Sequence, residues 1–213
     1  MNYLRKNYKN FIILLIGLFL MAIGGLFFIH ARLGADALMV LNQGVATFLN
    51  IKVGYAMMIT NLIGLIVIFI LYKKSIGIGT IAVSVVLGFI INFFDSFNII
   101  TNSESFIINL LMLFGAIFLG GFGVALYIFS NTGYSPFEGI IIYLVDKTKV
   151  RFGIVKIIND IIFFGIGYLL GGIVGIGSII AVILFGPIID FYLVMLNKFK
   201  DRKKNNEMAI NNI

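Results

Sequence analysis

The sequence predicts an all-α integral membrane protein with about six transmembrane helices in two inverted three-helix repeats. Three observations predict this class. Of the 213 residues 61% are apolar and 12% charged, the apolar residues form long spans, and the second half repeats landmarks of the first. Soluble chains have roughly 45–50% apolar and about 25% charged residues. We therefore predict one membrane domain over residues 1–213, which is neither an enzyme nor a nucleic-acid-binding protein.

The net charge of +7 fits this class. The basic residues cluster beside apolar spans, where such residues face anionic lipid headgroups at the cytoplasmic surface. The chain has no Cys and one His, which excludes disulfides and thiolate metal sites and makes a His-ligated metal centre improbable. We expect no metal and no other cofactor.

The apolar spans are each about 19–24 residues long, enough to cross a hydrocarbon layer of roughly 30 Å at about 1.5 Å per residue. The first follows basic residues, as a signal peptide does, but its apolar run is too long for a signal core, so we expect it to be retained. The spans cover residues 11–31, 53–72, 77–95, 106–129, 152–171 and 175–197.

Two shorter segments, 34–50 and 133–146, are interrupted by polar residues and proline. We expect Gly34 and Gly133 to start a short helix in each, with Asp36 or Ser135 at its N-cap or in its first turn. The polarity of the first segment and the short apolar core of the second predict re-entrant or interfacial helices, although spanning helices remain an alternative. The interrupting residues are Asp36, Asn42, Gln43, Ser135, Pro136 and Glu138.

An internal repeat organises these elements, with repeat 1 at about 10–97, repeat 2 at about 106–197 and a basic tail at 198–213. The prediction rests on the order of the landmarks and on their nearly constant offset. A shift of 99 residues superimposes Gly24 on Gly123, Gly34 on Gly133, Lys52 on Arg151, Gly54 on Gly153 and Asn61 on Asp160; a shift of 98 superimposes Gly77 on Gly175, Gly88 on Gly186 and Asn92 on Asp190.

The distribution of Lys and Arg predicts that both termini are cytoplasmic. With six spans, 13 of these residues lie inside and only Arg32 and Lys52 outside, as the positive-inside rule requires. If both short segments also crossed, the count would be 12 inside to 3 outside, so charge alone does not decide. Three spans per half is an odd number, which inverts the second half relative to the first.

Polar residues within the spans are the first candidates for a substrate path, because an ionisable side chain in hydrocarbon usually faces a protein interior or a watered cavity. Asp160 lies near the middle of the fifth span, and Lys156 is one turn before it. The alternative is that the two only neutralise each other, or that polar pairs only hold helices together. The substrate-path candidates are Asn61, Asp160, Lys156, Asn92 and Asp190.

The short segments provide the second set of candidates, because the amide groups at a helix N-terminus favour an anion or a carbonyl dipole. The same residues also suit ordinary turns and helix caps. These candidates are Gly34, Asp36, Gln43, Gly133, Ser135, Pro136 and Glu138.

Two runs of the chain resemble a known family. Leu33 and Gly34, the run from Val40 to Gly44, and Gly54 resemble the first-half signature of the YczE/YyaS/YitT group of bacterial membrane proteins. The run from Gly133 to Gly139 resembles the second-half signature, and the resemblance covers about residues 10–195. The first-half turn of that family usually reads Ser-Pro-aromatic-Asp, whereas Asp36-Ala37-Leu38-Met39 stands here, which weakens an acid-dependent role for it. The resemblance implies a multi-pass protein of the bacterial inner membrane.

Three functions remain open. The leading one is a small-solute transporter or permease of unknown substrate. The others are a substrate-binding membrane subunit that needs an energising partner, and a non-transport accessory protein. The expected partners are the lipid bilayer and an unknown small solute or ion, and a homo-oligomer or a partner membrane protein is left open.

Overall fold

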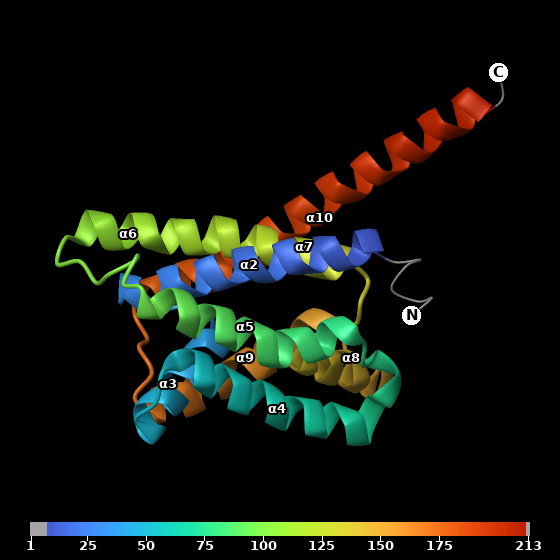
Figure 1. Ribbon diagram of the computed structural model, residues 1–213. Helices are drawn as coiled ribbons and strands as arrows, with labels where there is room; N and C mark the ends of the chain where they lie inside the picture. Colours follow the sequence, from blue (N-terminus) through green and yellow to red (C-terminus); the bar gives the residue numbers. More distant parts are fainter. Residues whose placement is uncertain (1–7, 212–213) are drawn as a thin grey trace.

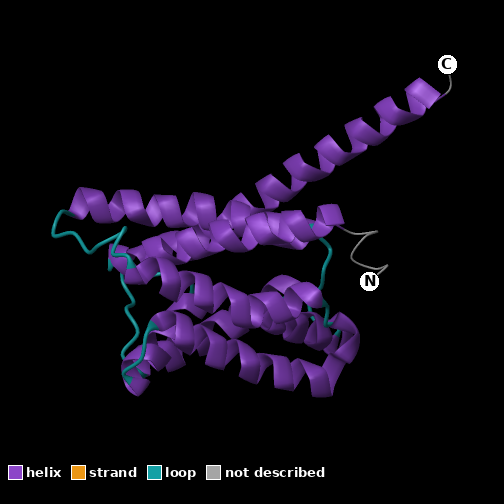
Figure 2. Ribbon diagram, viewed as in Figure 1, coloured by secondary structure: helices purple, strands orange, loops and turns teal. Residues whose placement is uncertain are grey.

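The computed structural model describes residues 8–211, and all secondary structure within that range is helical (Figure 2). The elements are α2 (Tyr8–Ala31), α3 (Ala37–Leu49), α4 (Val53–Tyr72), η1 (Lys73–Ser75), α5 (Ile78–Ser96), α6 (Phe106–Gly115), η2 (Ala116–Gly120), α7 (Gly121–Phe129), α8 (Pro136–Thr148), α9 (Phe152–Leu169) and α10 (Ile176–Asn211).

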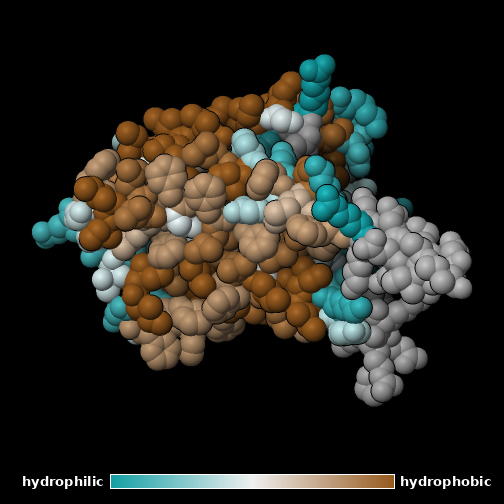
Figure 3. All heavy atoms as spheres, turned by 90° about the horizontal axis from the view of Figure 1, so that it is seen from above, coloured by the Kyte–Doolittle hydropathy of each residue, from teal (hydrophilic) through white to brown (hydrophobic). Residues whose placement is uncertain are grey.

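Five helices are long and apolar enough to cross a membrane by length and composition. Large apolar side chains on them face outward; Ile70, for example, is 76% exposed. Brown apolar atoms cover most of the middle of the visible face, and teal polar atoms gather mainly toward its ends (Figure 3). An outer surface of this kind suits lipid better than water. The five cover Tyr8–Ala31, Val53–Ser75, Ile78–Ser96, Phe106–Phe129 and Ile176–Lys200.

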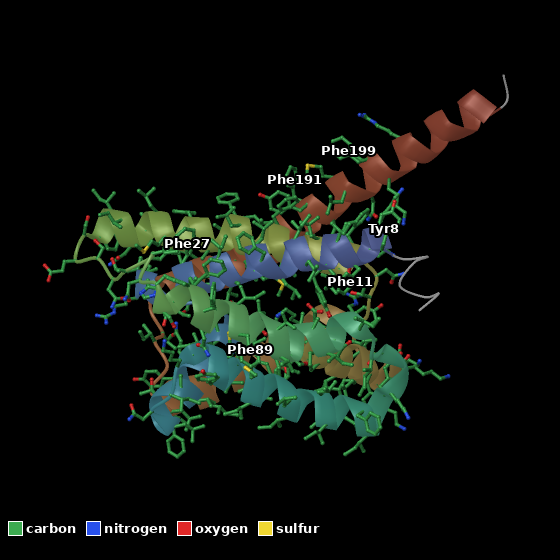
Figure 4. The ribbon with its side chains drawn as sticks, in the orientation of Figure 1. Tyr8, Phe11, Phe27, Phe89, Phe191 and Phe199 are labelled. Atoms are coloured by element: carbon green, nitrogen blue, oxygen red, sulfur yellow. The ribbon has the colours of Figure 1, made fainter. Side chains whose placement is uncertain are left out.

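The predicted spans match the helices to within a few residues except at the C-terminus. There α10 continues through the basic tail to Asn211, past the expected end at residue 197. Its C-terminal part leaves the bundle (Figure 1), and Phe191 and Phe199 project from this region (Figure 4). Arg5 and Lys6, which entered the charge count, lie outside the described residues.

The helix α2 packs closely on η2 and on α7. A Cβ atom on Gly24 would meet the backbone of Gly120, and one on Gly17 would meet the backbone of Gly123 and Tyr127. These glycines therefore allow the two backbones to approach each other closely. Gly120 ends η2, a five-residue π-helical turn between α6 and α7.

Each short helix packs on a long helix from the other half of the chain. The helix α3 packs on α9, where Gly44 and Gly167 approach each other, and α8 packs on α4, where Gly139 lies against Ile68. The two short helices lie toward opposite ends of the bundle (Figure 1). Gly165, two residues before Gly167 on α9, has no neighbour that a Cβ atom would meet within 4 Å. It is exposed because α9 turns this face outward.

Candidate functional site

The short helices begin one residue after Asp36 and Ser135, which confirms the predicted caps. The Asp36 carboxylate accepts the backbone N–H of Leu38 at 3.1 Å and of Met39 at 3.2 Å. Ser135 forms a capping box with Glu138, each side chain accepting the other residue's N–H at 3.4 Å. Pro136 occupies the first helical position, where its missing N–H leaves no hydrogen bond unmade.

Gly34 and Gly133 do not start the helices, contrary to expectation. Each lies two residues before the cap with a positive φ, +97° and +123° respectively, and forms a turn that other residues adopt only with strain. Asp36 and Ser135 themselves have the extended backbone of an N-cap residue.

The two glycine turns contact the first turns of α10 and α5, each in the opposite half of the chain. Gly177 N–H donates to the Leu33 carbonyl at 2.7 Å, and Gly79 N–H donates to the Thr132 carbonyl at 2.9 Å. Hydroxyl groups complete both contacts. Ser178 Oγ accepts from Ala35 N–H at 3.2 Å, and Thr80 Oγ1 donates to the Tyr134 carbonyl at 2.7 Å.

A charged pair lies on α9. Lys156 Nζ is 2.9 Å from both carboxylate oxygens of Asp160, and the two side chains are 48% and 23% exposed. The predicted contact is therefore present, one helical turn apart. Whether it only neutralises charge or also serves a substrate is a question of function.

Two carboxyl groups from the short helices lie within electrostatic reach of Lys156, and both are outside the five long apolar helices. Burial raises the pKa of Asp36, while the N–H of Met39 and the charge of Lys156 act in the opposite direction. Burial also raises the pKa of Glu138, against its hydrogen bonds with Ser135 and the charge of Lys156. Lys156 therefore acts electrostatically on a carboxyl group at the start of each short helix as well as on Asp160. We call these four residues the charged cluster: Asp36, Glu138, Lys156 and Asp160.

This charged cluster combines one ammonium and three carboxyl groups with two helix N-termini. Burial favours the protonated form of Asp36 and Glu138, whereas Lys156 and the helix N-termini favour negative charge at the same carboxyl groups. The arrangement is suited to binding a small polar solute or ion and to moving protons. Within the described residues, no group of three His, Asp or Glu side chains could hold a metal ion.

The remaining substrate-path candidates lie apart from one another. Asn61 is buried in α4, and Asn92 is buried in α5, where its Oδ1 accepts the N–H of Gly54 at 3.1 Å. Asp190 is exposed on α10. In α3, the buried Gln43 accepts the N–H of Ile173 through Oε1 at 3.4 Å.

Sequence reasoning missed a buried polar contact between α3 and α4. Thr60 Oγ1 donates to Asn42 Oδ1 at 2.6 Å, and both side chains are buried. Asn42 Nδ2 is buried with no hydrogen-bond partner among the described residues, so the amide retains an unused donor. The sequence showed two separate signals, Asn42 as a polar interruption of the segment 34–50 and Thr60 next to Asn61 in mid-span, but nothing that paired them.

Comparison with known proteins identifies the family of this chain. A family model described as a family of unknown function, DUF6198, matches residues 8–194. The chain belongs to the DUF6198 family. It is also similar to an uncharacterized protein of Haemophilus influenzae, with 25% identity over 187 residues that cover 88% of this chain and 84% of that protein. No solved structure matches this DUF6198 chain.

Proposed function

We propose that this DUF6198 protein is a small-solute transporter or permease of the bacterial cytoplasmic membrane. The observation that carries the proposal is the charged cluster, in which Lys156 of α9 contacts Asp160 and acts electrostatically on carboxyl groups at the starts of two short helices. A charged side chain near the bilayer centre costs about 2.5–3.5 kcal/mol on insertion scales. Transport of a polar solute across the membrane would explain why the protein keeps charged side chains there despite this cost.

The proposal includes six crossings in two inverted repeats. Its support is that contacts recur at the predicted offsets: Leu33 with Gly177 in one place, and Thr132 with Gly79 in the other. Opposite placement of α3 and α8 in the bundle agrees with inversion (Figure 1). At about 1.5 Å per residue, the 18 residues of α9 reach about 27 Å, which suffices for a sixth crossing.

Orientation follows from the basic residues, with both termini in the cytoplasm. On this basis α3 enters from the outside and α8 from the cytoplasmic side, and neither crosses. We also propose kinship with the YczE/YyaS/YitT group, because its second-half signature coincides with the Gly133 turn and the Ser135 cap.

One observation favours a second candidate. The outward face of α9 and α10 is extensively exposed, with Ile161 at 64% and Ile183 at 62%. A substrate-binding subunit or an accessory protein would use such a face for a partner membrane protein. A pull-down distinguishes these cases, since a stable ATPase partner favours the binding subunit and a biosynthetic enzyme favours the accessory role.

A ligand screen tests the proposed transporter. Purified protein is melted in the presence of a library of metabolites and inorganic ions, since a ligand that binds only the folded state raises the melting temperature. Compounds that stabilise the wild type are then tested for uptake into proteoliposomes. The matched control replaces the α9 pair by Lys156→Met with Asp160→Leu. A folded double variant that binds and transports as the wild type does would overturn the proposed site.

A further inference from the structure

The helix pair α4 and α5 is closed by two glycines and an asparagine. A Cβ atom on Gly54 would collide with the Gly88 carbonyl, and a Cβ atom on Gly88 would collide with the Gly54 carbonyl. Gly54 is the second residue of α4, where a helix offers its N–H no internal acceptor. Asn92 Oδ1 accepts that N–H at 3.1 Å, so the side chain joins the two helices.

The corresponding residues of α9 and α10 are exposed and do not pack against each other. At the offsets of 99 and 98 residues, Gly54, Gly88 and Asn92 correspond to Gly153, Gly186 and Asp190. All three of the latter are exposed, and a Cβ atom on either glycine would meet nothing within 4 Å. The principal contacts of α9 are with α3 and α8, whereas α10 packs on α7 and η2.

In the present arrangement no neighbouring atom requires glycine at positions 153 and 186. Within a helix it is less favourable than alanine by roughly 0.5–1 kcal/mol, and here no close neighbour requires the missing side chain. Gly153 is also the second residue of its helix, so its N–H likewise lacks an internal acceptor. The pair α9 and α10 therefore carries glycines at the positions that let α4 and α5 pack together, although α9 and α10 are not packed together here.

We propose that α9 and α10 close on each other in a second conformation, in the way α4 and α5 do here. Gly153 would then face Gly186, and the Asp190 carboxyl would accept the Gly153 N–H. Because Asp160 is the counterpart of Asn61, which is buried in the closed pair, closure would cover the α9 charged pair. This inference rests on the proposed transporter and its repeat. Closing and opening of α9 on α10 would give alternating access to the charged cluster.

Distance measurements between spin labels test this closure, and the cysteine-free chain allows labels at chosen positions. Ile162→Cys with Ile179→Cys reports on α9 and α10, and Ile63→Cys with Ile81→Cys reports on the corresponding positions of α4 and α5. All four side chains are exposed. By double electron–electron resonance in proteoliposomes, we expect the first pair to give a long distance and a shorter one that matches the closed first-half pair.

Valine substitutions separate closure from folding. Gly153→Val and Gly186→Val should leave the melting temperature unchanged, because the new side chains meet open space, yet should remove the shorter distance. Gly165→Val is the matched control: it is equally open in α9, but its counterpart is Ile66, so it should keep both distances. Asp190→Leu should deplete the shorter distance, and Asp190→Asn should retain it.

Two results would overturn the proposal. One is a single long distance that no substitution alters. The other is an intermolecular distance between singly labelled Ile162→Cys chains, with a dimer by light scattering, which would make this face an interface between copies. The labels need no substrate, so closure without solute uptake would reject the proposed transporter alone.

Discussion

The helix pairs α4–α5 and α9–α10 carry glycines at matching positions but differ in packing. In the first pair, Gly54 and Gly88 are buried against each other, whereas Gly153 and Gly186 in the second are exposed. The difference shows that a glycine indicates where two helices can approach and does not establish that they do. The following substitutions test this comparison, beginning with the largest expected effect.

Gly54→Val should be the most destabilising, by about 3 kcal/mol, because its Cβ atom would collide with the Gly88 carbonyl and the Asn92 side chain. Gly153→Val is the control and should be nearly neutral. The measurement is equilibrium unfolding in detergent. Equal destabilisation by the two variants would show that α9 and α10 are already packed together in the ground state.

The charged pair distinguishes α9 from α4, where Asn61 stands in place of Asp160. Asp160→Asn should destabilise by about 2 kcal/mol, because Lys156 would lose the one carboxylate that it contacts directly and would keep only the longer-range attraction of Asp36 and Glu138. Lys156→Met combined with Asp160→Leu should recover the loss, since an apolar pair needs no partner. Unfolding of the three proteins measures this, and failure of the double variant to recover would assign Asp160 a further structural contact.

Asn92→Leu tests the hydrogen bond that only the closed pair makes. The loss should be about 1–2 kcal/mol, because the buried Gly54 N–H would lose its acceptor. Asp190→Leu removes the counterpart from an exposed position and should leave stability unchanged. Melting curves compare the two, and a larger effect at Asp190 would contradict the open arrangement.

The smallest expected effect is the pH dependence of stability that comes from Asp36 and Glu138 at the starts of the two short helices. Burial raises the pKa of Asp36 and Glu138 in the folded protein, so the folded state binds protons more tightly than the unfolded state. Stability should therefore be greatest below the ordinary values of 3.8 and 4.5 and should fall as pH rises toward the folded-state values.

Glu138→Gln should reduce this pH dependence, because the amide cannot titrate yet can still accept the Ser135 N–H. Ser135→Ala should instead steepen it, since one hydrogen bond that favours the Glu138 carboxylate is lost. Melting temperatures over a pH series provide the test. A wild-type protein whose stability rises with pH across this range would contradict the assigned direction.

Local features of the molecule could be predicted from the sequence. Hydropathy predicted the bounds of α4, and short-range chemistry predicted the caps Asp36 and Ser135, because a cap bonds to its own helix. The Lys156–Asp160 pair was predicted for the same reason, since helical spacing alone brings the two together.

Contacts between helices could not be predicted in this way. The spacing of residues on α8 and α9 does not reveal that Glu138 lies within reach of Lys156, and nothing local indicates that Thr60 donates to Asn42. Gly165 and Gly167 are two residues apart, yet only Gly167 approaches another backbone. Which face of a helix meets a neighbour depends on the packing of the whole bundle.

The crossing of α2 and α7 has a consequence for the ancestry of the chain. One helix lies in the first half of the chain and the other in the second, and Gly17 and Gly123 let their backbones touch. A contact of this kind joins two separate polypeptides as readily as two parts of one. If the two halves are the inverted repeats proposed above, a half-length ancestor that inserted in both orientations would have assembled through such a contact as an antiparallel dimer. A gene fusion would then have produced the present order of helices.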